Sequence, residues 1–530
     1  MNALVGTGQL LKLGLRRSRI MLAVWVYALA AYAASTAYGF KKLYDTPDSV
    51  RHFTSGINGN GSTVAMYGRI LVPDSLGGIT AWRLAALGGV MVGVMSVLLV
   101  VRHTRGDEDA GRLELVGAGV VGRRAPLTAG LLVGVVANLA LALVTTIVLI
   151  AIGLPTAGSL AVGLAWAVPG LFFTAVAGVT AQLAETAQAA RGIALAVVGV
   201  AYLLRAVGDA ARVSWLVWVS PIGWSQRVRA FGGERWWLIA LGVVVAVAVV
   251  AVAYALVGRR DLGAGLLPVR PGPAEAAPSL RSPLALAWRL QRGAFLSWLA
   301  AFVVYGAAIG GILKGVGDLV KDSSSAKDFL AKMGGQRGLE DSYVGTVMGV
   351  LGLIAAVYAV QVVLRLRTEE TAQRLEPLLA TRVRRVRWSI GHLLFAAAGP
   401  AVLLGLAGVA AGLVHGLRVH DLGTQVPRLL GAAMVQLPAA WVTAAIALLL
   451  FGVVPRFVAA AWGVLGVFLL LGQMGPVLKL SQAVMDVSPF THVPKLPGSG
   501  LTVTPLAVLT AVAVAGAAAG LVGFRRRDIG

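Results

Sequence analysis

The chain has 530 residues, of which 58% are hydrophobic and 13% are charged, and its mean hydropathy is +0.81. Because a soluble globular protein carries about 25% charged residues, this composition excludes a soluble protein and indicates one that resides in the lipid bilayer. The net charge of +23 then reflects basic residues beside membrane spans, and we expect no nucleic-acid partner. With no cysteine in the chain, disulfides, thiolate catalysis and cysteine-ligated metal sites are excluded.

Apolar segments long enough to cross a bilayer recur along the whole chain. A helix of about 20 apolar residues spans the roughly 30 Å of hydrocarbon, and no alternating pattern typical of a β-barrel is present. We therefore predict an all-α polytopic membrane protein with twelve transmembrane helices. In chain order, the predicted spans cover residues 20–38, 84–101, 126–153, 159–182, 193–208, 236–257, 294–313, 344–364, 389–414, 428–452, 457–475 and 502–523.

Several motifs occur twice along the chain, which indicates a duplicated unit. The corresponding pairs are RGDEDAGRLE (105–114) and RTEETAQRLE (367–376), SPIGW (220–224) and SPFTH (488–492), and RDLG (260–263) and RDIG (527–530). Parallel repeats of this kind pack about an axis along the membrane normal, so we predict two tandem six-helix repeats. The first six-span transmembrane half covers residues 1–263 and the second covers 284–530, joined by a Pro- and Ala-rich cytoplasmic linker at 264–283.

The basic residues beside the predicted spans favour cytoplasmic N- and C-termini, because Lys and Arg are enriched on the cytoplasmic side of membrane helices. Most basic clusters fall on one side of the membrane if the N-terminus is cytoplasmic. These clusters lie at residues 16–19, 102–124, 365–387 and 525–527. Three arginines on the outer side, Arg227, Arg229 and Arg235, weaken this bias.

The acidic motif lies in the loop between the second and third predicted spans of each half. Glu108 and Arg112 stand four residues apart, as do Glu370 and Arg374, and such pairs stabilise a surface helix by about 0.3 kcal/mol each. Each loop is either a solvated segment at the membrane surface or a docking helix for a cytoplasmic partner. Two equivalent helices in one chain suit two copies of a partner arranged by pseudo-symmetry.

Motifs of nucleotide-binding and catalytic sites are absent. The chain has no G-x-x-x-x-G-K-[ST] sequence and no H-E-x-x-H sequence, so it contains neither a P-loop nor a zincin site. His415 and His420 are five residues apart, which is poor spacing for two metal ligands on one helix face. We therefore expect a transport subunit that is not itself an enzyme and binds no metal or cofactor.

Two ionisable residues fall near the outer end of the fifth predicted span. Arg205 and Asp209 are four residues apart, and charged groups at membrane depth are costly and usually paired. Two interpretations are open: an internal ion pair that fixes the fifth span against the following segment, or a gate for substrate. Asn138 in the third span is expected to form an interhelical hydrogen bond.

Taken in order, these motifs resemble a bacterial ABC exporter permease of the polyketide-antibiotic (tetronasin-type) exporter family, in its duplicated twelve-span form. The resemblance covers nearly the whole chain. It rests on the two E-x-x-x-R-L-E loops, LRAVGD at 204–209, SPIGW, and GQMGPVLKLSQAVMDVSPFTHVP at 472–494. It implies a bacterial plasma-membrane protein that exports amphipathic or hydrophobic compounds such as antibiotics. It also implies a separate cytoplasmic ATPase subunit, present in two copies, which holds ATP and Mg.

The resemblance further implies that the acidic loops contain the coupling helices that contact the ATPase. The residues that carry over are Asp107, Glu108, Arg112, Glu114, Glu369, Glu370, Arg374 and Glu376. One departure is Pro377 in the second loop, where the first has Leu115; a proline there is expected to shorten the second helix. The SPIGW and SPFTH segments are implied to be re-entrant, so Pro221 and Pro489 join Arg205 and Asp209 as candidate outer-gate residues.

Resemblance to ABC exporters places the substrate cavity between the second and fifth spans of the two halves. Flexible Met and amphipathic Tyr side chains suit a promiscuous apolar cavity, although each is also an ordinary packing residue. The candidates are Met91, Met95, Ser96, Met348, Tyr358 and Gln361.

The alternative is a proton-coupled secondary multidrug transporter of the major facilitator kind, which also has two six-span halves. The loop GDEDAGR resembles the acidic and basic loop between its second and third spans. Apart from Asp209, the sequence offers no buried acid suited to proton coupling.

Overall fold

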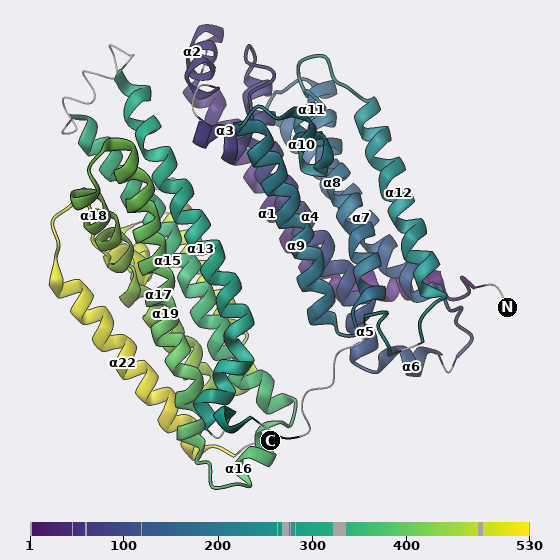
Figure 1. The fold of residues 1–530 in the computed structure, drawn as a ribbon, viewed down its shortest axis with the longest axis vertical. Coiled ribbons are helices and arrows are strands. Elements are labelled where there is room, and N and C mark those ends of the chain that lie inside the picture. The colour runs from purple at the N-terminus through teal and green to yellow at the C-terminus, as the bar shows by residue number, and fades with distance from the viewer. Residues whose placement is uncertain are drawn as a thin grey trace. The chain divides into compact units, whose positions relative to one another are not determined.

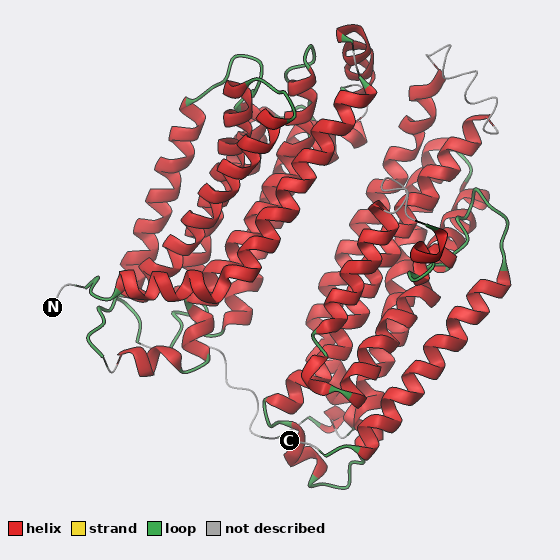
Figure 2. Cartoon of the chain, turned by 180° about the vertical axis from the view of Figure 1, so that it is seen from behind, coloured by secondary structure: helices red, strands yellow, loops and turns green. Residues whose placement is uncertain are grey.

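The structure is a computed structural model that describes residues 3–44, 46–58, 61–117, 119–261, 263–267, 275, 277–280, 282–321, 335–474 and 481–528. Over these residues the regular structure is helical (Figure 2), apart from one isolated β-bridge between Ala184 and Leu267. The chain divides into two compact units, Met1–Gly272 and Pro273–Gly530. This division falls within the predicted linker, of which residues 268–274, 276 and 281 lie outside the described residues. The bridge ties Leu267 in the linker to Ala184 in the first unit.

The first unit contains long helices joined by short helical connections (Figure 1). Its helices are α1 (Thr7–Leu43), α2 (Pro47–Ile57), α3 (Gly61–Tyr67), α4 (Leu76–His103), α5 (Arg105–Asp109), α6 (Arg112–Gly117), α7 (Ala125–Ala151), α8 (Thr156–Leu183), α9 (Ala187–Ala210), α10 (Ser214–Val219), α11 (Pro221–Arg227) and α12 (Trp237–Val257). Helices α2, α3, α10 and α11 lie at the end opposite α5 and α6.

The second unit has a similar succession of long and short helices. Its elements are η1 (Pro278–Leu280), α13 (Pro283–Lys321), α15 (Gly335–Thr371), α16 (Leu375–Leu379), α17 (Arg385–Val419), α18 (Leu422–Met434), α19 (Leu437–Val453), η2 (Pro455–Phe457), α20 (Ala460–Met474), α21 (Gln482–Met485), η3 (Pro489–His492) and α22 (Val503–Arg526).

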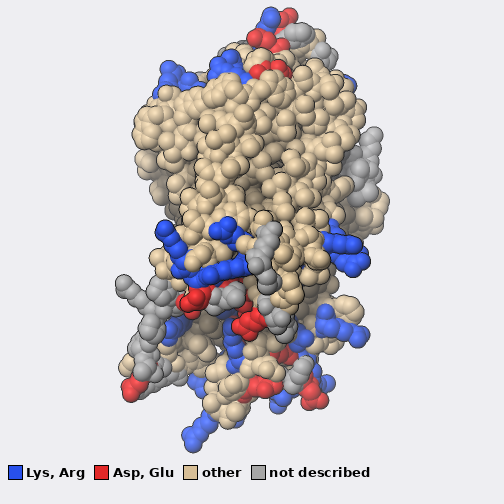
Figure 3. Space-filling model, turned by 90° about the vertical axis from the view of Figure 1, so that its right-hand side faces the viewer, with Lys and Arg blue, Asp and Glu red and all other residues tan. Residues whose placement is uncertain are grey.

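By length and composition, eleven helical stretches in the described residues can cross a membrane, one fewer than predicted. They are Thr7–Leu43, Leu76–Asp109, Ala125–Ala151, Thr156–Leu183, Ala187–Ala210, Trp237–Val257, Pro283–Leu313, Glu340–Thr371, Arg385–Val419, Leu422–Val453 and Val503–Arg526. The predicted span at 457–475 corresponds to α20, which has 15 residues and is shorter than the roughly 20 needed. On the face shown in Figure 3, a broad band without charged side chains lies below the charged groups at the top of the view and above those in its lower half. With eleven apolar stretches of this length, the chain is a multi-pass membrane protein.

In each unit the second long helix is central. Helix α4 packs against α1, α7, α8 and α9, and α15 packs against α13, α17 and α19. Close packing in α4 depends on glycine: a Cβ at Gly88 would lie 2.3 Å from the ring of Trp166, as expected where small residues let membrane helices approach. Asn138 Nδ2 donates to Ser96 Oγ at 2.9 Å, which confirms the predicted interhelical hydrogen bond.

Candidate functional site

The carboxylate of Glu108, in the first acidic loop, is bound by three residues from two segments. Arg105 Nη1 contacts Oε2 at 2.7 Å, and the backbone N–H of Gly263 donates to Oε1 at 2.6 Å. Arg260, just beyond α12, binds both oxygens through Nη1 and Nη2 at 2.7 and 2.9 Å. The Glu108 side chain is only 4% exposed. Bidentate charge-assisted bonds of this kind are strong, so Glu108 fastens α5 to the end of α12.

The second unit repeats this arrangement with Glu370 at the end of α15. Arg527, just beyond α22, binds both oxygens at 2.6 and 2.8 Å, and Arg367 Nη1 lies 3.1 Å from Oε2. The backbone carbonyls of the two distal arginines are also held alike: Arg123 donates to Arg260 O and Arg385 to Arg527 O, each at 2.7 Å. We call these two assemblies the carboxylate clamps, Glu108–Arg260 and Glu370–Arg527.

The predicted pairs Glu108–Arg112 and Glu370–Arg374 are wrong. Arg112 instead pairs with Asp107 at 2.8 Å, and Arg374 lies 3.7 Å from Glu369. A residue with positive φ interrupts each loop, Gly111 at 68° and Gln373 at 55°, and the helix therefore ends before the i, i+4 geometry can form.

The loop residues beyond these turns are exposed. The side chains of Arg112 and Arg374 are 53% and 64% exposed, and Glu114 and Glu376 are also exposed. In contrast, Asp107, Glu369 and Glu370 are buried, and the side chain of Glu108 is only 4% exposed. The predicted coupling residues therefore form two groups of four. The acids that precede Gly111 and Gln373 are paired within the chain and hold the loops in place. The residues that follow them are accessible, on α6 and at the start of α16.

Arg205 and Asp209 lie near the end of α9 and form the predicted ion pair, with Nη1 and Oδ2 separated by 3.8 Å. Arg205 is fully buried, and its Nη2 also donates to the carbonyls of Ala65 and Met66 at 2.9 and 3.0 Å. Arg205 therefore fastens α9 to the last turn of α3, where free carbonyls favour a cation. The sequence had suggested instead that this ion pair fixes α9 to the segment that follows it in the chain.

That following segment, which holds Pro221, is anchored by its preceding serine. Ser220 Oγ donates to the carbonyl of Ala201 at 2.7 Å and accepts from Gly223 N at the start of α11, while Pro221 occupies the first helical position, where proline is favoured. In the second unit, Pro489 is buried at the start of η3. Each of these prolines is thus the first residue of a short helix.

The predicted substrate-cavity residues differ in accessibility. Met95, Ser96, Met348 and Tyr358 are fully buried among packed helices. Met91 is 38% exposed, and Gln361 is exposed while its Oε1 accepts from Trp298 Nε1 at 2.9 Å. The first four act as packing residues in their units, and Met91 and Gln361 remain accessible.

An apolar cavity of about 280 Å³ lies within the second unit, among α15, α17, α19 and α22. Its polar lining atoms are internally satisfied: Trp441 Nε1 donates to Ala397 O at 2.9 Å and Thr510 Oγ1 to Leu506 O at 2.8 Å. The walls are lined by Val363, Leu393, Ala396, Ala397, Trp441, Ala444, Ala445, Leu448, Thr510, Ala513, Val514 and Ala517. Such a cavity suits an apolar chain or ring, and the sequence carries no mark that distinguishes it from ordinary helix packing.

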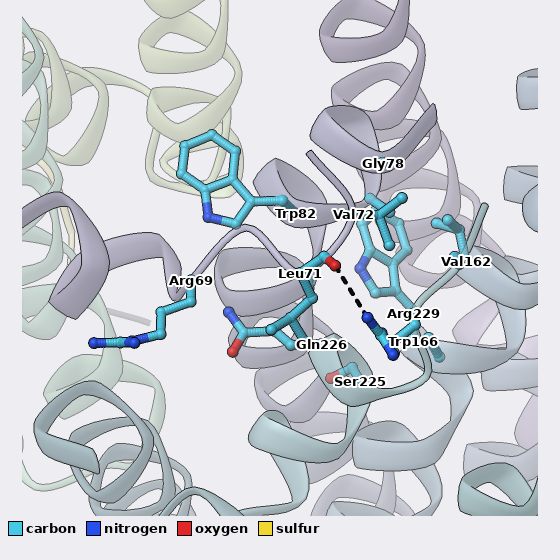
Figure 4. Close-up of a pocket in the computed structure, with 14 residues that line it drawn as sticks. Arg69, Leu71, Val72, Gly78, Trp82, Val162, Trp166, Ser225, Gln226 and Arg229 are labelled. Carbon is cyan, nitrogen blue, oxygen red and sulfur yellow. Dashed lines mark hydrogen bonds between the residues drawn. The ribbon is translucent and has the colours of Figure 1, made fainter. Parts of the chain in front are cut away.

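A basic cavity of about 290 Å³ lies in the first unit near α3, α10 and α11. It is lined by Arg69, Leu71, Asp209, Val217, Gln226, Arg227, Arg229 and Arg235. A smaller adjoining pocket shares Arg69, Leu71, Gln226 and Arg229 and includes Trp82 and Trp166 (Figure 4). In the sequence, Arg227, Arg229 and Arg235 stand out only as exceptions to the cytoplasmic enrichment of basic residues.

Comparison with known proteins places the chain among transporters. The family model described as "Multidrug efflux system permease Rv1217c, C-terminal domain" matches residues 280–525. The chain is 41% identical over 526 residues to the multidrug efflux system permease protein Rv1217c of Mycobacterium tuberculosis, with 99% of this chain and 95% of that protein aligned. The aligned region covers both units, and the chain therefore belongs to the Rv1217c family of multidrug efflux system permeases.

Proposed function

We propose that the chain is the transmembrane subunit of an ATP-driven ABC exporter for amphipathic and hydrophobic compounds, polyketide antibiotics among them. In this proposal two copies of a cytoplasmic ATPase subunit hold ATP and Mg and dock on α6 and α16. The observation that carries the proposal is the pair of carboxylate clamps, because each joins an exposed loop rigidly to the ends of two long helices.

The clamps give the exposed loops a mechanical role. A partner bound to Arg112 and Glu114 acts on a segment that the Glu108–Arg260 clamp joins to α4 and α12. The same holds for Glu376 and the Glu370–Arg527 clamp between α15 and α22. A solvated loop would need no buried, bidentate attachment, since surface ion pairs contribute only about 0–1 kcal/mol. Movement of the partner is thereby passed to the long helices and so to the substrate.

The proposal also includes twelve spans in two repeats, with α20 as part of the eleventh span, and cytoplasmic termini. The matched clamps and motifs support the repeats. In the first unit α5, α6 and the N-terminus lie at the same end (Figure 1), which supports a cytoplasmic N-terminus if α6 docks the ATPase. Met91 and Gln361, which stay accessible, are our candidates for substrate contact.

A proton-coupled carrier is less well supported. Such a carrier needs a buried acid that is free to gain and lose a proton. Asp209 lies 3.8 Å from Arg205, and Glu108 and Glu370 are each held by two guanidinium groups.

The first test is a pull-down of the tagged full chain from native membranes, with ATPase activity measured on the eluate. We expect a co-purified ATPase subunit, and we expect the double charge reversal Glu114→Lys and Glu376→Lys to remove it and abolish export while membrane insertion stays normal. The control is Asp48→Lys with Asp486→Lys, which makes the same charge change at exposed residues outside the loops. Normal export and co-purification in the loop variant contradict docking at α6 and α16.

A further inference from the structure

Four arginine side chains from three segments converge on the basic cavity of the first unit. Arg69 follows α3, Arg227 ends α11, and Arg229 and Arg235 lie in the connection to α12. The lining contains four arginines and one aspartate, a net charge of +3. All four arginine side chains are half-buried, so water and salt screen their mutual repulsion less than on an open surface.

The protein itself supplies little negative charge to this cluster. Asp209 is the one acid in the cavity wall, and it is already within ion-pair distance of Arg205. Among the described residues, Arg69 and Arg229 donate to backbone carbonyls, of Asp209 at 3.2 Å and Leu71 at 3.4 Å. Within the described residues, Arg229 Nε is buried without a hydrogen-bond partner. A buried unpaired donor is costly, and an anion in the cavity removes that cost.

Arg227 is likewise a partly buried cation with little negative charge around it. Its guanidinium lies 4.7 Å from the ring of Trp218. Burial lowers the pKa of Arg227, the neighbouring Asp209 raises it, and Arg235 lowers it. A guanidinium stays protonated in proteins, so an anion beside it would compensate for its lost hydration.

The wall of the cavity is held in place before any ligand arrives. Gln226 Nε2, in the wall, donates to Tyr67 O at 2.5 Å. In the adjoining pocket, Trp82 Nε1 donates to Gly68 O at 2.7 Å. Figure 4 shows Gln226, Arg69 and Arg229 around Leu71, with the bond from Arg229 to the Leu71 carbonyl. A pre-formed site binds without the cost of ordering its side chains.

Exposed tryptophans place this cavity at the level of lipid head groups. Trp215 on α10 and Trp236 and Trp237 at the start of α12 are 63%, 42% and 53% exposed. Exposed tryptophans at helix ends are typical of the interface between lipid and water. Helix α9 packs against α10, and exposed apolar side chains on α9 and α12, such as Val207 and Val244, can contact acyl chains.

We propose that the basic cavity binds the oxyanion head group, phosphate or carboxylate, of an amphipathic anion whose apolar part lies in the membrane. Guanidinium groups recognise such oxyanions through paired N–H donors. The amphipath has two sources, a resident anionic phospholipid or an exported anionic compound. The second source rests on the proposed export function; the binding of the head group does not.

The test measures lipid binding to the purified full chain in detergent by native mass spectrometry. The probes are dioleoyl phosphatidylglycerol, dioleoyl phosphatidylcholine with the same acyl chains, and decyl phosphate. We expect the phosphatidylglycerol to bind about tenfold more tightly than the phosphatidylcholine, and Arg227→Gln with Arg235→Gln to remove this preference. Binding that is equal for the two phospholipids, or a preference that survives the double substitution, overturns the proposal.

The control is Arg51→Gln with Arg212→Gln, which removes two exposed arginines from the same end of the first unit and is expected to keep the preference. If the cavity variant elutes as an aggregate, Arg235→Gln alone is used, since it removes one charge from the cavity in place of two. Decyl phosphate that displaces phosphatidylglycerol identifies an anionic compound as an acceptable ligand, and phosphatidylglycerol that resists it identifies a resident lipid. Neither readout uses ATP, so loss of the proposed ATPase coupling leaves this result unaffected.

Discussion

The carboxylates of Glu108 and Glu370 are each bound by two guanidinium groups, so their charge is compensated within the chain and is not offered to a partner. Glu114 and Glu376, each six positions further along the chain, carry the same charge but are exposed. At the scale of single residues, burial and pairing therefore divide the acidic motif into two parts that the sequence does not distinguish: glutamates paired within the chain, and glutamates exposed to solvent. Removing one partner of a buried pair costs about 3–5 kcal/mol, whereas an exposed carboxylate contributes far less.

We expect Glu108→Gln to lower the free energy of unfolding by about 3 kcal/mol, because Arg105 and Arg260 lose their shared carboxylate. Thermal unfolding of the purified protein in detergent measures this change as a fall in Tm. The matched control is Glu114→Gln in the same loop, which is expected to change stability by less than about 0.5 kcal/mol. Equal Tm values for the two variants contradict the buried clamp.

At the scale of helices, glycine decides where α4 and α8 meet. Trp166 is fully buried and its Nε1 donates to the Leu84 carbonyl at 3.0 Å, so the indole cannot move away from Gly88 without losing a hydrogen bond. Not every helical glycine has this role: at Gly199 on α9 an added Cβ meets no atom within 4 Å. The same substitution therefore has opposite consequences on the two helices.

We expect Gly88→Ala to destabilise the protein by about 1–3 kcal/mol through overpacking against Trp166. Gly199→Ala is the control; it is expected to be neutral or to stabilise by up to about 1 kcal/mol, because alanine favours helix over glycine. Both are measured as Tm in detergent. A fall in Tm for Gly199→Ala that matches the fall for Gly88→Ala would contradict the packing argument.

For the whole molecule, the lengths of the apolar runs in the sequence predicted the order and approximate positions of the long helices. They could do so because the thickness of the bilayer sets how many apolar residues a membrane-spanning helix needs. They placed the start of α1 at residue 20, whereas the helix begins at Thr7, since its first turns are amphipathic and lie outside any apolar run. The repeat of RDLG and RDIG was visible, but its role was not, because Arg260 meets Glu108 only after 152 residues of chain fold back. Likewise, the contact of Arg205 with Ala65 and the positive φ of Gln373 depend on tertiary structure that no local pattern encodes.

The two exposed loop surfaces lead to a prediction about the assembled transporter. If each loop docks one ATPase copy, the single reversal Glu114→Lys leaves the loop on α16 intact, and Glu376→Lys leaves the loop on α6 intact. We expect each single variant to co-purify with one ATPase copy in place of two, and the double variant with none. Mass photometry of the purified complexes measures this stoichiometry.

Export is expected to fail in both single variants, because a lone ATPase copy lacks the partner with which the proposal pairs it. Stability separates this outcome from misfolding: Glu114 and Glu376 are exposed, so the Tm of each variant without ATPase should stay near that of the parent chain. Two bound copies in either single variant would show that docking does not depend on that loop. A complete loss of both copies in a single variant would show instead that the ATPase binds only as a preformed dimer across both loops.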